Sequence, residues 1–284
     1  MRRYWILLLA CAILAVALES TAKANGTHAT HTAYNGKLFI AYSSSPNPTP
    51  LAIDKRTITW LKHPTQPKQK IALVPIGYHT KPAVVRLSSD LAITIQQAPY
   101  KQESIKVLDS SKIHPSKKEQ KRIAKEREEV LAIYKHNRKA TYWTKPFAYP
   151  VKRVTITSPF GGARVFNGEV HSFHSGTDFR APQGTPIYAV NDGVVVLAKD
   201  RFISGKSVVI DHGNGIYTTY FHNSKLLVRA GKFVRKGEKI ALSGATGRVS
   251  GAHLHFGVVC NGVQIDPLDF IKQINALFGV SSSI

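Results

Sequence analysis

Cysteine is almost absent from this chain, which has two cysteines in 284 residues. Cys11 lies in an apolar stretch near the N-terminus, so only Cys260 remains if that stretch is removed. No internal disulfide is then possible. The valine-rich neighbours of Cys260, residues 256–259, predict a buried cysteine on a strand.

Acidic residues are also scarce, because 17 Asp and Glu stand against 39 Lys and Arg. The net charge is +22 and the isoelectric point is about 10.0. This balance indicates an anionic partner, and both nucleic acid and a polyanionic cell envelope fit it. From residue 25 onward, 36 basic and 16 acidic side chains still leave +20.

Long apolar runs are missing except at the N-terminus. Residues 4–18 carry no charge and follow Arg2 and Arg3. The run is too short and wrongly flanked for a membrane-spanning helix. Residues 22–24 read Ala-Lys-Ala, the small-x-small pattern of a signal-peptidase site, so we expect a signal peptide over residues 1–24.

An exported protein meets envelope polymers rather than DNA, so we expect anionic envelope polymers as partners and no nucleic acid. The expected location is the periplasm or cell envelope, with no transmembrane span after cleavage. A lipid anchor on Cys11 is the less favoured alternative, because the apolar run continues well past this residue.

What the chain has in quantity is short β-forming segments. Hydrophobic residues make up 43% of the sequence, and the length suits two modest folded units. In residues 25–110, strand-like segments alternate with Ser/Pro/Asn clusters, which predicts a small β-sandwich-like domain. The expected strands there are 38–42, 58–61, 70–76 and 83–87.

Residues 111–149 change character and predict a helical linker. Ser116 and Glu119 have the spacing of a capping box, in which each side chain satisfies a backbone N–H of the first turn. Apolar residues then recur on one helical face. They are Ile123, Val130, Leu131 and Tyr134. We expect the remaining face to be basic and solvated.

From residue 150 to residue 284 the β pattern returns. Glycine turns separate the strand-like segments, and neither a βαβ alternation nor a long amphipathic helix precedes Asp266. An antiparallel β-sheet core is therefore expected. Its predicted strands are 153–157, 186–190, 193–197, 207–210 and 216–221.

The segment Ala252-His253-Leu254-His255-Phe256 offers two histidines at strand spacing. On a strand, both imidazoles face one side, while Leu254 and Phe256 face the core. A one-residue slip would bury both imidazoles. Upstream, His174 and Asp178 flank Gly176, which argues against a helix through them. Catalytic zinc takes three protein ligands and keeps one position for water, so His174, Asp178 and His255 predict one zinc per chain.

His222 and His253 are the candidate catalytic pair. Zinc lowers the pKa of its bound water to about 7, and a nearby imidazole can take the proton or stabilise the oxyanion. The sequence leaves other roles open. His222 could be a surface loop histidine, and His253 could support the ligands. Either one could also complete a closed, purely structural zinc site.

Several motifs, in order, resemble one family. They are Phe173-His174-Ser175-Gly176-Thr177-Asp178, Ala181-Pro182-Gln183-Gly184-Thr185-Pro186, Ile210-Asp211-His212-Gly213-Asn214-Gly215, Tyr220-Phe221-His222, Ser243-Gly244-Ala245-Thr246-Gly247-Arg248 and His253-Leu254-His255-Phe256-Gly257. Residues 150–275 thus resemble the lysostaphin-like, LytM-type zinc metallopeptidases, exported members of which carry a similar N-terminal module.

The resemblance implies a zinc-dependent endopeptidase that cleaves peptide cross-bridges of bacterial peptidoglycan. His174, Asp178 and His255 match the family's zinc ligands, and His222 and His253 match its catalytic histidines. The alternative is a catalytically inactive LytM domain that activates a cell-wall amidase, but such domains are expected to lose zinc ligands. The N-terminal module could bind glycan, cover the active site or act as a spacer.

Two positions near the site depart from the family pattern. Asn223 replaces the usual leucine after the first catalytic histidine, and Ala252 replaces the usual proline before His-Leu-His. Neither removes a ligand or a proton carrier, so they bear on specificity or loop rigidity. His212 matches a structural position, hydrogen-bonded beside a turn. Three further residues are expected to line the cleft on sequence proximity. They are Arg164, Asn167 and Ser175.

Overall fold

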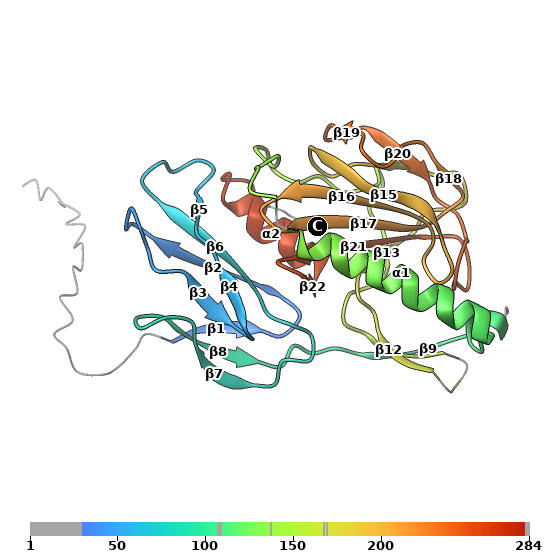
Figure 1. Cartoon of the computed structure of the whole chain (residues 1–284), viewed down its shortest axis with the longest axis horizontal. Helices are drawn as coiled ribbons and strands as arrows, with labels where there is room; N and C mark the ends of the chain where they lie inside the picture. The colour runs from blue at the N-terminus through green and yellow to red at the C-terminus, as the bar shows by residue number, and fades with distance from the viewer. Residues whose placement is uncertain (1–29, 107–109, 137, 167, 169, 282–284) are drawn as a thin grey trace, which may run out of the picture.

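Two groups of strands lie side by side in the computed structural model (Figure 1). It describes residues 30–106, 110–136, 138–166, 168 and 170–281. The expected signal peptide and Cys11 lie outside these residues. No helix within the described ranges is long and apolar enough to cross a membrane.

The N-terminal β unit, residues 30–96, contains two three-stranded sheets and a hairpin. One sheet has the order β1-β8-β7, with β1 and β8 parallel; the other has the order β2-β6-β5; the hairpin is β3-β4. The strands are β1 (Thr30–Tyr34), β2 (Leu38–Ser43), β3 (Leu51–Ile53), β4 (Arg56–Ile58), β5 (Leu61–Lys62), β6 (Lys70–Pro75), β7 (Ala83–Arg86) and β8 (Ala92–Gln96). The single strand expected over 58–61 is split into β4 and β5, and the indole of Trp60 donates to the Thr49 carbonyl.

Strand β6 is buried on both faces, and this explains its continuous apolar run. Ala72 and Val74 belong to the core of the N-terminal β unit, whereas Ile71 and Leu73 belong to the main core shared with the C-terminal half. Strand alternation sends the two pairs to opposite sides. The unit is therefore packed onto the rest of the chain through β2 and β6.

The linker region contains the short helix η1 (Ser110–Lys112) and the long helix α1 (Lys117–Lys135). The predicted capping box is confirmed, because Ser116 Oγ accepts from Glu119 N and the Glu119 carboxylate accepts from Ser116 N. Val130 and Tyr134 pack on the C-terminal sheet with Ile133, while Leu131 is 44% exposed. The helix therefore covers the sheet (Figure 1). Its exposed side carries several Lys and Arg residues.

The predicted mainly β fold with an antiparallel C-terminal core is confirmed. An eight-stranded sheet has the order β10-β13-β21-β17-β16-β15-β19, with β22 paired to β21. Its strands are β10 (Ile156–Ser158), β13 (Thr177–Phe179), β15 (Gly193–Arg201), β16 (Gly205–Gly213), β17 (Ile216–Asn223), β19 (Phe233–Val234), β21 (Leu254–Cys260) and β22 (Val263–Ile265). Cys260 is fully buried in β21, as expected.

Smaller elements complete the C-terminal half. Strands β14 (Pro186–Tyr188), β20 (Lys239–Leu242) and β18 (Lys225–Leu226) form one sheet. Helix α2 (Pro267–Ala276) begins at Asp266, whose carboxylate accepts from the N–H groups of Leu268 and Asp269. This helix packs against β2, so it lies between the two halves.

A third sheet joins the two halves next to the ligand loop. It has the order β12-β11-β9, formed by β12 (Val170–Phe173), β11 (Ala163–Phe166) and β9 (Gln102–Ile105), and β9 runs parallel to β11. The N-terminal Tyr78 stacks on Phe173, with ring centroids 4.1 Å apart. Phe173 directly precedes His174, so the N-terminal half contacts the segment that carries the first predicted ligand.

Candidate metal centre and catalytic cleft

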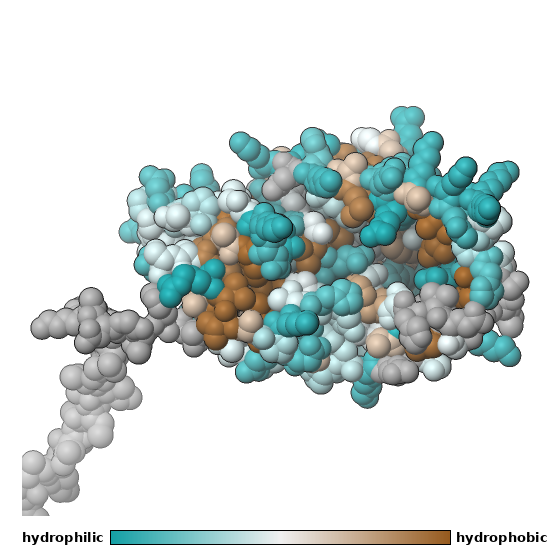
Figure 2. Space-filling model, turned by 60° about the horizontal axis from the view of Figure 1, so that its bottom comes forward, coloured by the Kyte–Doolittle hydropathy of each residue, from teal (hydrophilic) through white to brown (hydrophobic). Residues whose placement is uncertain are grey.

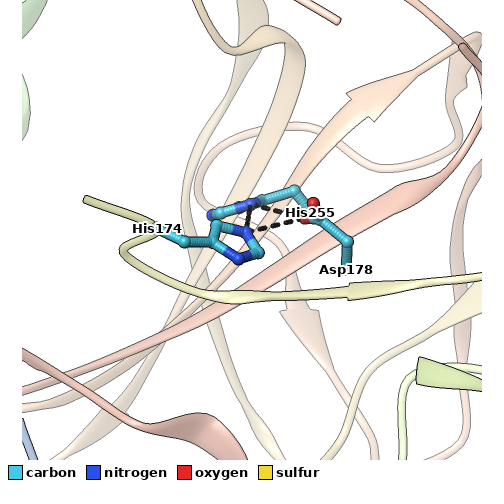
Figure 3. A group of neighbouring side chains, drawn as sticks. All are labelled: His174, Asp178 and His255. Atoms are coloured by element: carbon cyan, nitrogen blue, oxygen red, sulfur yellow. Dashed lines mark hydrogen bonds and ion pairs between the residues drawn. The ribbon is translucent and has the colours of Figure 1, made fainter. Parts of the chain in front are cut away.

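Asp178 and His255 face each other across paired strands. They are directly opposite in the antiparallel β13–β21 ladder, and His174 lies in the turn that leads into β13. Figure 3 shows the three side chains converging. Gly176 permits this approach, because a Cβ there would lie 2.6 Å from His255 Nε2. The structure thus brings together three residues that are 81 positions apart at most.

The three donor atoms form a tight triangle. His174 Nε2 lies 2.9 Å from Asp178 Oδ1 and 3.0 Å from His255 Nδ1, and His255 Nδ1 lies 2.9 Å from Asp178 Oδ1. Across the carboxylate, Arg164 donates to Asp178 Oδ2 at 2.7 Å and to Ser158 Oγ at 2.9 Å. Both carboxylate oxygens are therefore held in position.

The tautomer of His174 is set by its other nitrogen. Nδ1 lies 2.8 Å from the Pro159 carbonyl, which can only accept, so Nδ1 carries the proton. Nε2 of neutral His174 then points a lone pair at an ionised carboxylate oxygen and at His255 Nδ1. Two converging acceptors repel unless a proton or a cation lies between them. This donor set fits a metal ion, since tetrahedral ligands about 2.0–2.2 Å from zinc lie roughly 3.3–3.6 Å from one another, slightly farther apart than these donors.

Electrostatics keep these groups in their ligating forms. Burial alone would raise the pKa of Asp178, but its contacts with His174 and His255 outweigh burial and hold this pKa well below the usual range. Burial lowers the pKa of His255 to about 4, against the opposing effect of Asp178. A carboxylate and a neutral imidazole are the forms that bind a metal.

His222, the next-to-last residue of β17, has an uncommon backbone conformation. Its φ of 65° lies in the left-handed region, which non-glycine residues seldom adopt and which histidine tolerates better than most. Two hydrogen bonds hold it there. Its N–H donates to Ser204 O at 2.9 Å, and its Nδ1 donates to Thr246 O at 2.8 Å. Nε2 therefore keeps its lone pair. Burial first, then His253 and His255, lower the pKa of His222 well below 6.5.

His253 precedes β21 and pairs with Gly244 in an isolated bridge. Its Nδ1 donates to the Gly251 carbonyl at 2.9 Å, and its Nε2 lies 3.6 Å from Asp178 Oδ1. The His222 and His253 rings are 5.0 Å apart between centroids. The two imidazoles thus approach the metal triangle together, each anchored to a backbone carbonyl.

The apolar partners of these histidines behave as the strand pattern predicts. Leu254 and Phe256 are fully buried on the opposite side of β21. Asn223 is buried as well, and its amide donates to the carbonyls of Lys206 and Tyr220, both at 2.8 Å. Asparagine in place of leucine therefore adds two hydrogen bonds to backbone carbonyls beside His222.

His212 has the structural role expected of it. It is fully buried, and its two ring nitrogens contact the Asp192 carbonyl at 2.7 Å and Thr218 Oγ1 at 2.8 Å. Burial lowers its pKa to about 4, although the Asp192 carbonyl opposes this effect. Both nitrogens are occupied within the fold, so His212 is not available to a substrate.

A cleft of about 630 Å³ reaches the metal triangle at Asp178 and is also lined by His222 and His253. Arg164 also lines it, as expected, but Ser175 does not, and Asn167 lies outside the described residues. On the C-terminal half, at the right of Figure 2, hydrophilic side chains are more frequent than hydrophobic ones. Sequence reasoning missed two arginines of the lining, Arg180 and Arg248. The two-residue spacing of Arg180 from Asp178 could have indicated the first.

Comparison with known proteins finds relatives of the C-terminal half. The sequence model of Peptidase family M23 matches residues 172–267. The peptidoglycan DD-endopeptidase ShyA of Vibrio cholerae is 47% identical over 95 residues, which are 34% of this chain and 22% of that protein. The DD-carboxypeptidase/endopeptidase Mpg of Neisseria meningitidis is 39% identical over 119 residues, which are 42% of this chain and 27% of that protein.

A solved structure extends the likeness to both halves. A crystal structure of a putative peptidase M23 from Pseudomonas aeruginosa superposes with a TM-score of 0.65 at 28% identity, covering 84% of this chain and 94% of that one. The match to this chain spans only about a fifth to a third of the length of the curated relatives. Within this limit the resemblance read from the motifs is confirmed.

Proposed function

We propose that this chain is a zinc-dependent endopeptidase that hydrolyses peptide cross-bridges of bacterial peptidoglycan, from the match of residues 172–267 to Peptidase family M23 and the likeness to ShyA. One observation carries the proposal. The donor atoms of His174, Asp178 and His255 converge beside a cleft that Asp178, His222 and His253 line. The relatives named above as peptidoglycan endopeptidases support the substrate class.

We assign His174, Asp178 and His255 as the ligands of one zinc ion per chain. Two imidazoles and one carboxylate are a common catalytic zinc set, and Asp178 of the donor triangle borders the cleft. When bound, the ion supplies Lewis-acid activation of water and of the scissile carbonyl. Arg164 keeps Asp178 Oδ1 turned to the histidines by binding Oδ2.

His222 and His253 are the proposed proton carriers. Each donates Nδ1–H to a backbone carbonyl, so each offers Nε2 to the cleft. Neutral His222 can take a proton at Nε2, and a protonated Nε2 can donate to the oxyanion or to the departing amine. Their rings, 5.0 Å apart, are close enough to act on one substrate group.

The alternative function, a non-catalytic activator of a cell-wall amidase, is not favoured. Such a role does not need a metal, and loss of one ligand would be tolerated. In this chain all three ligand positions are filled and held by second contacts, such as Pro159 O on His174 and Arg164 on Asp178. The three ligand positions and both proposed proton carriers are all present, and this favours an enzyme.

We also propose the division of the chain and its location. Residues 1–24 are a signal peptide, residues 25–110 a β domain, residues 111–149 a helical linker and residues 150–284 the peptidase domain. The small-x-small site, the separate apolar cluster of the N-terminal β unit and the extent of helix α1 support this division. Export would place the basic protein among anionic envelope polymers.

Digestion of purified sacculi tests the proposal. The mature protein should contain about one zinc per chain and should convert cross-linked muropeptide dimers to monomers. A chelator should stop the reaction, and added zinc should restore it. Intact dimers under these conditions, together with stimulation of a purified amidase, would support the activator instead.

A further inference from the structure

Glu126 is a buried residue of helix α1, although it is charged. Acidic side chains are seldom buried unless they are paired, and both carboxylate oxygens of Glu126 have a partner. Oε1 accepts from Arg122 Nε at 2.7 Å, within the same helix, and Oε2 accepts from the backbone N–H of Phe202 at 2.9 Å. The second hydrogen bond leaves the helix and reaches the turn of residues 202–204, which joins β15 to β16.

Two further contacts fix this turn from the helix side. Arg201 Nη2 donates to the backbone carbonyl of Glu126 at 3.1 Å. The Lys112 ammonium lies 3.7 Å from the centroid of the Phe202 ring, and Phe202 itself is buried. The start of the turn is therefore held by groups of the linker region, and Glu126 supplies the hydrogen bond to its first backbone N–H.

The next two residues of the turn bind the backbone around His222. Ser204 O accepts from His222 N–H at 2.9 Å, and Ile203 O accepts from the backbone N–H of Arg248 at 2.8 Å. The second hydrogen bond fixes the loop that contains Thr246, whose carbonyl accepts His222 Nδ1–H at 2.8 Å. Both hydrogen bonds that hold His222 thus depend on the turn, one directly and one through this loop.

Two glycines let the turn and the loop pack backbone against backbone. A Cβ at Gly205 would lie 2.3 Å from Thr246 O, and a Cβ at Gly247 would lie 2.4 Å from Ile203 O. Groups packed this closely transmit a displacement instead of absorbing it. The left-handed backbone of His222 persists only where its surroundings hold it. The position of its imidazole therefore follows the position of the turn.

We propose that Glu126 is a positioning residue for His222 and acts through the turn of residues 202–204. The proposal rests on the proposed endopeptidase function and gives the linker helix a part in it. Glu126 is not among the residues that line the cleft, so it has no direct contact with the substrate there. Without its carboxylate, the Phe202 N–H loses its acceptor and the turn relaxes away from His222, while the metal ligands stay in place.

The Nδ1–H proton of His222 reports the position of the ring without catalysis. It is buried and donates to Thr246 O, so it should give a slowly exchanging low-field proton resonance in the full chain, identified by its absence in His222→Ala. Glu126→Ala should shift this resonance and speed its exchange with water about 10-fold or more. Glu126→Gln keeps an oxygen acceptor for the Phe202 N–H and should retain the resonance of the unmodified protein.

Muropeptide digestion by the zinc-loaded protein measures the catalytic consequence. Glu126→Ala should lower kcat about 10-fold with unchanged KM and zinc content, because a misplaced catalytic group costs rate and not binding. Glu126→Gln should recover most of this loss. Glu129→Ala is the matched control, since it removes an exposed ion pair with Lys199 between the same helix and β15. It should change neither the resonance nor kcat.

A milder variant keeps the test decisive if Glu126→Ala fails to fold. Glu126→Asp retains the charge but withdraws the carboxylate by one methylene, so it should shift the resonance and lower kcat, whereas Glu126→Gln should not. An unshifted His222 resonance in the alanine and aspartate variants, or a glutamine variant as impaired as they are, would overturn the positioning role. A resonance that depends on Glu126, in a protein that leaves cross-linked dimers intact, would instead overturn the endopeptidase.

Discussion

The two halves of this molecule use buried histidine in opposite ways. In the N-terminal β unit, His63 is buried, and its Nδ1 accepts the N–H groups of Thr65 and Gln66, which closes a turn. In the C-terminal half, His174 and His222 donate Nδ1–H to carbonyls. An accepting Nδ1 makes the ring part of the backbone network, whereas a donating Nδ1 leaves a lone pair on Nε2 for chemistry. A donating Nδ1 is needed for a free Nε2 but does not suffice, because His212 also donates Nδ1–H to a carbonyl, of Asp192, and its Nε2 is held by Thr218 Oγ1.

The halves also differ in what their buried polar groups do together. Among the described residues of the N-terminal β unit, the buried polar side chains are Asn35 and His63, and each bonds to nearby backbone. In the C-terminal half, buried polar side chains from distant strands meet at one point. At this point several hydrogen-bond acceptors meet with too few protons to satisfy all of them. Such an arrangement does not stabilise a fold, so it indicates a metal centre.

The largest effect should come from breaking this convergence. Asp178→Asn keeps the shape but removes the charge, so we expect loss of bound zinc and a decrease in kcat/KM of about a thousandfold or more. Metal analysis and muropeptide digestion measure the two effects. Asp200→Asn, an exposed acid on β15, is the matched control and should change neither. Full zinc content in the Asp178 variant would refute its assignment as a ligand.

Next in size is the loss of a proton carrier. His222→Ala should retain zinc and lower kcat by about 10²- to 10⁴-fold, because the metal ligands remain while general acid–base catalysis is lost. His63→Ala is the partner experiment in the other half. It should lower thermal stability and leave kcat unchanged. Similar kcat values for the two variants would remove the distinction between the histidines.

A structural histidine inside the C-terminal half should be visible in the pH dependence of stability. The pKa of His212 is about 4 in the folded protein and about 6.5 when unfolded. The unfolded chain therefore binds this proton first, and the free energy of unfolding falls as the pH drops from about 6.5 to 4, by up to about 3 kcal/mol.

Urea unfolding of the metal-free protein at several pH values measures this effect. His212→Asn cannot titrate, so its profile should be flatter than that of the unmodified protein over the same window. Other buried histidines contribute equally to both proteins and cancel in the difference. Parallel profiles would show that His212 does not titrate as its burial requires.

The smallest effect tests how far the halves depend on each other. Tyr78→Ala removes the ring stacked on Phe173 and should lower the free energy of unfolding by about 2 kcal/mol. Because Phe173 precedes His174, zinc affinity should fall as well. Val84→Ala, at a site 67% exposed, should stay within about 0.5 kcal/mol. Unchanged zinc affinity in the Tyr78 variant would make the N-terminal β unit a spacer.

Local signals predicted the local features of this fold. The capping box of Ser116 and Glu119, the turn glycines, and the alternation of His253, Leu254 and His255 depend on residues close in sequence. Spacing and family resemblance named all five site residues, which the structure brings together. The strand predicted over 58–61 is split between β4 and β5, because Thr59 and Trp60 lie outside both ladders.

Long-range features escaped sequence reasoning. Pairing of β9 with β11 has no periodic signature, and neither does burial of β6 on a second face. The carbonyls that orient the proposed catalytic histidines, from Thr246 and Gly251, come from loops whose side chains give no sign of this role. Backbone acceptors are present at every position, so only the fold reveals which of them are used.

Zinc content of two neighbouring variants tests the central claim most directly. The account assigns His255 to the metal and His253 to proton transfer, although the two lie on one face two residues apart. Purified His253→Ala should contain about one zinc per chain, and purified His255→Ala should contain almost none. Zinc retained in both proteins, or lost from both, would contradict this division of the His-Leu-His segment.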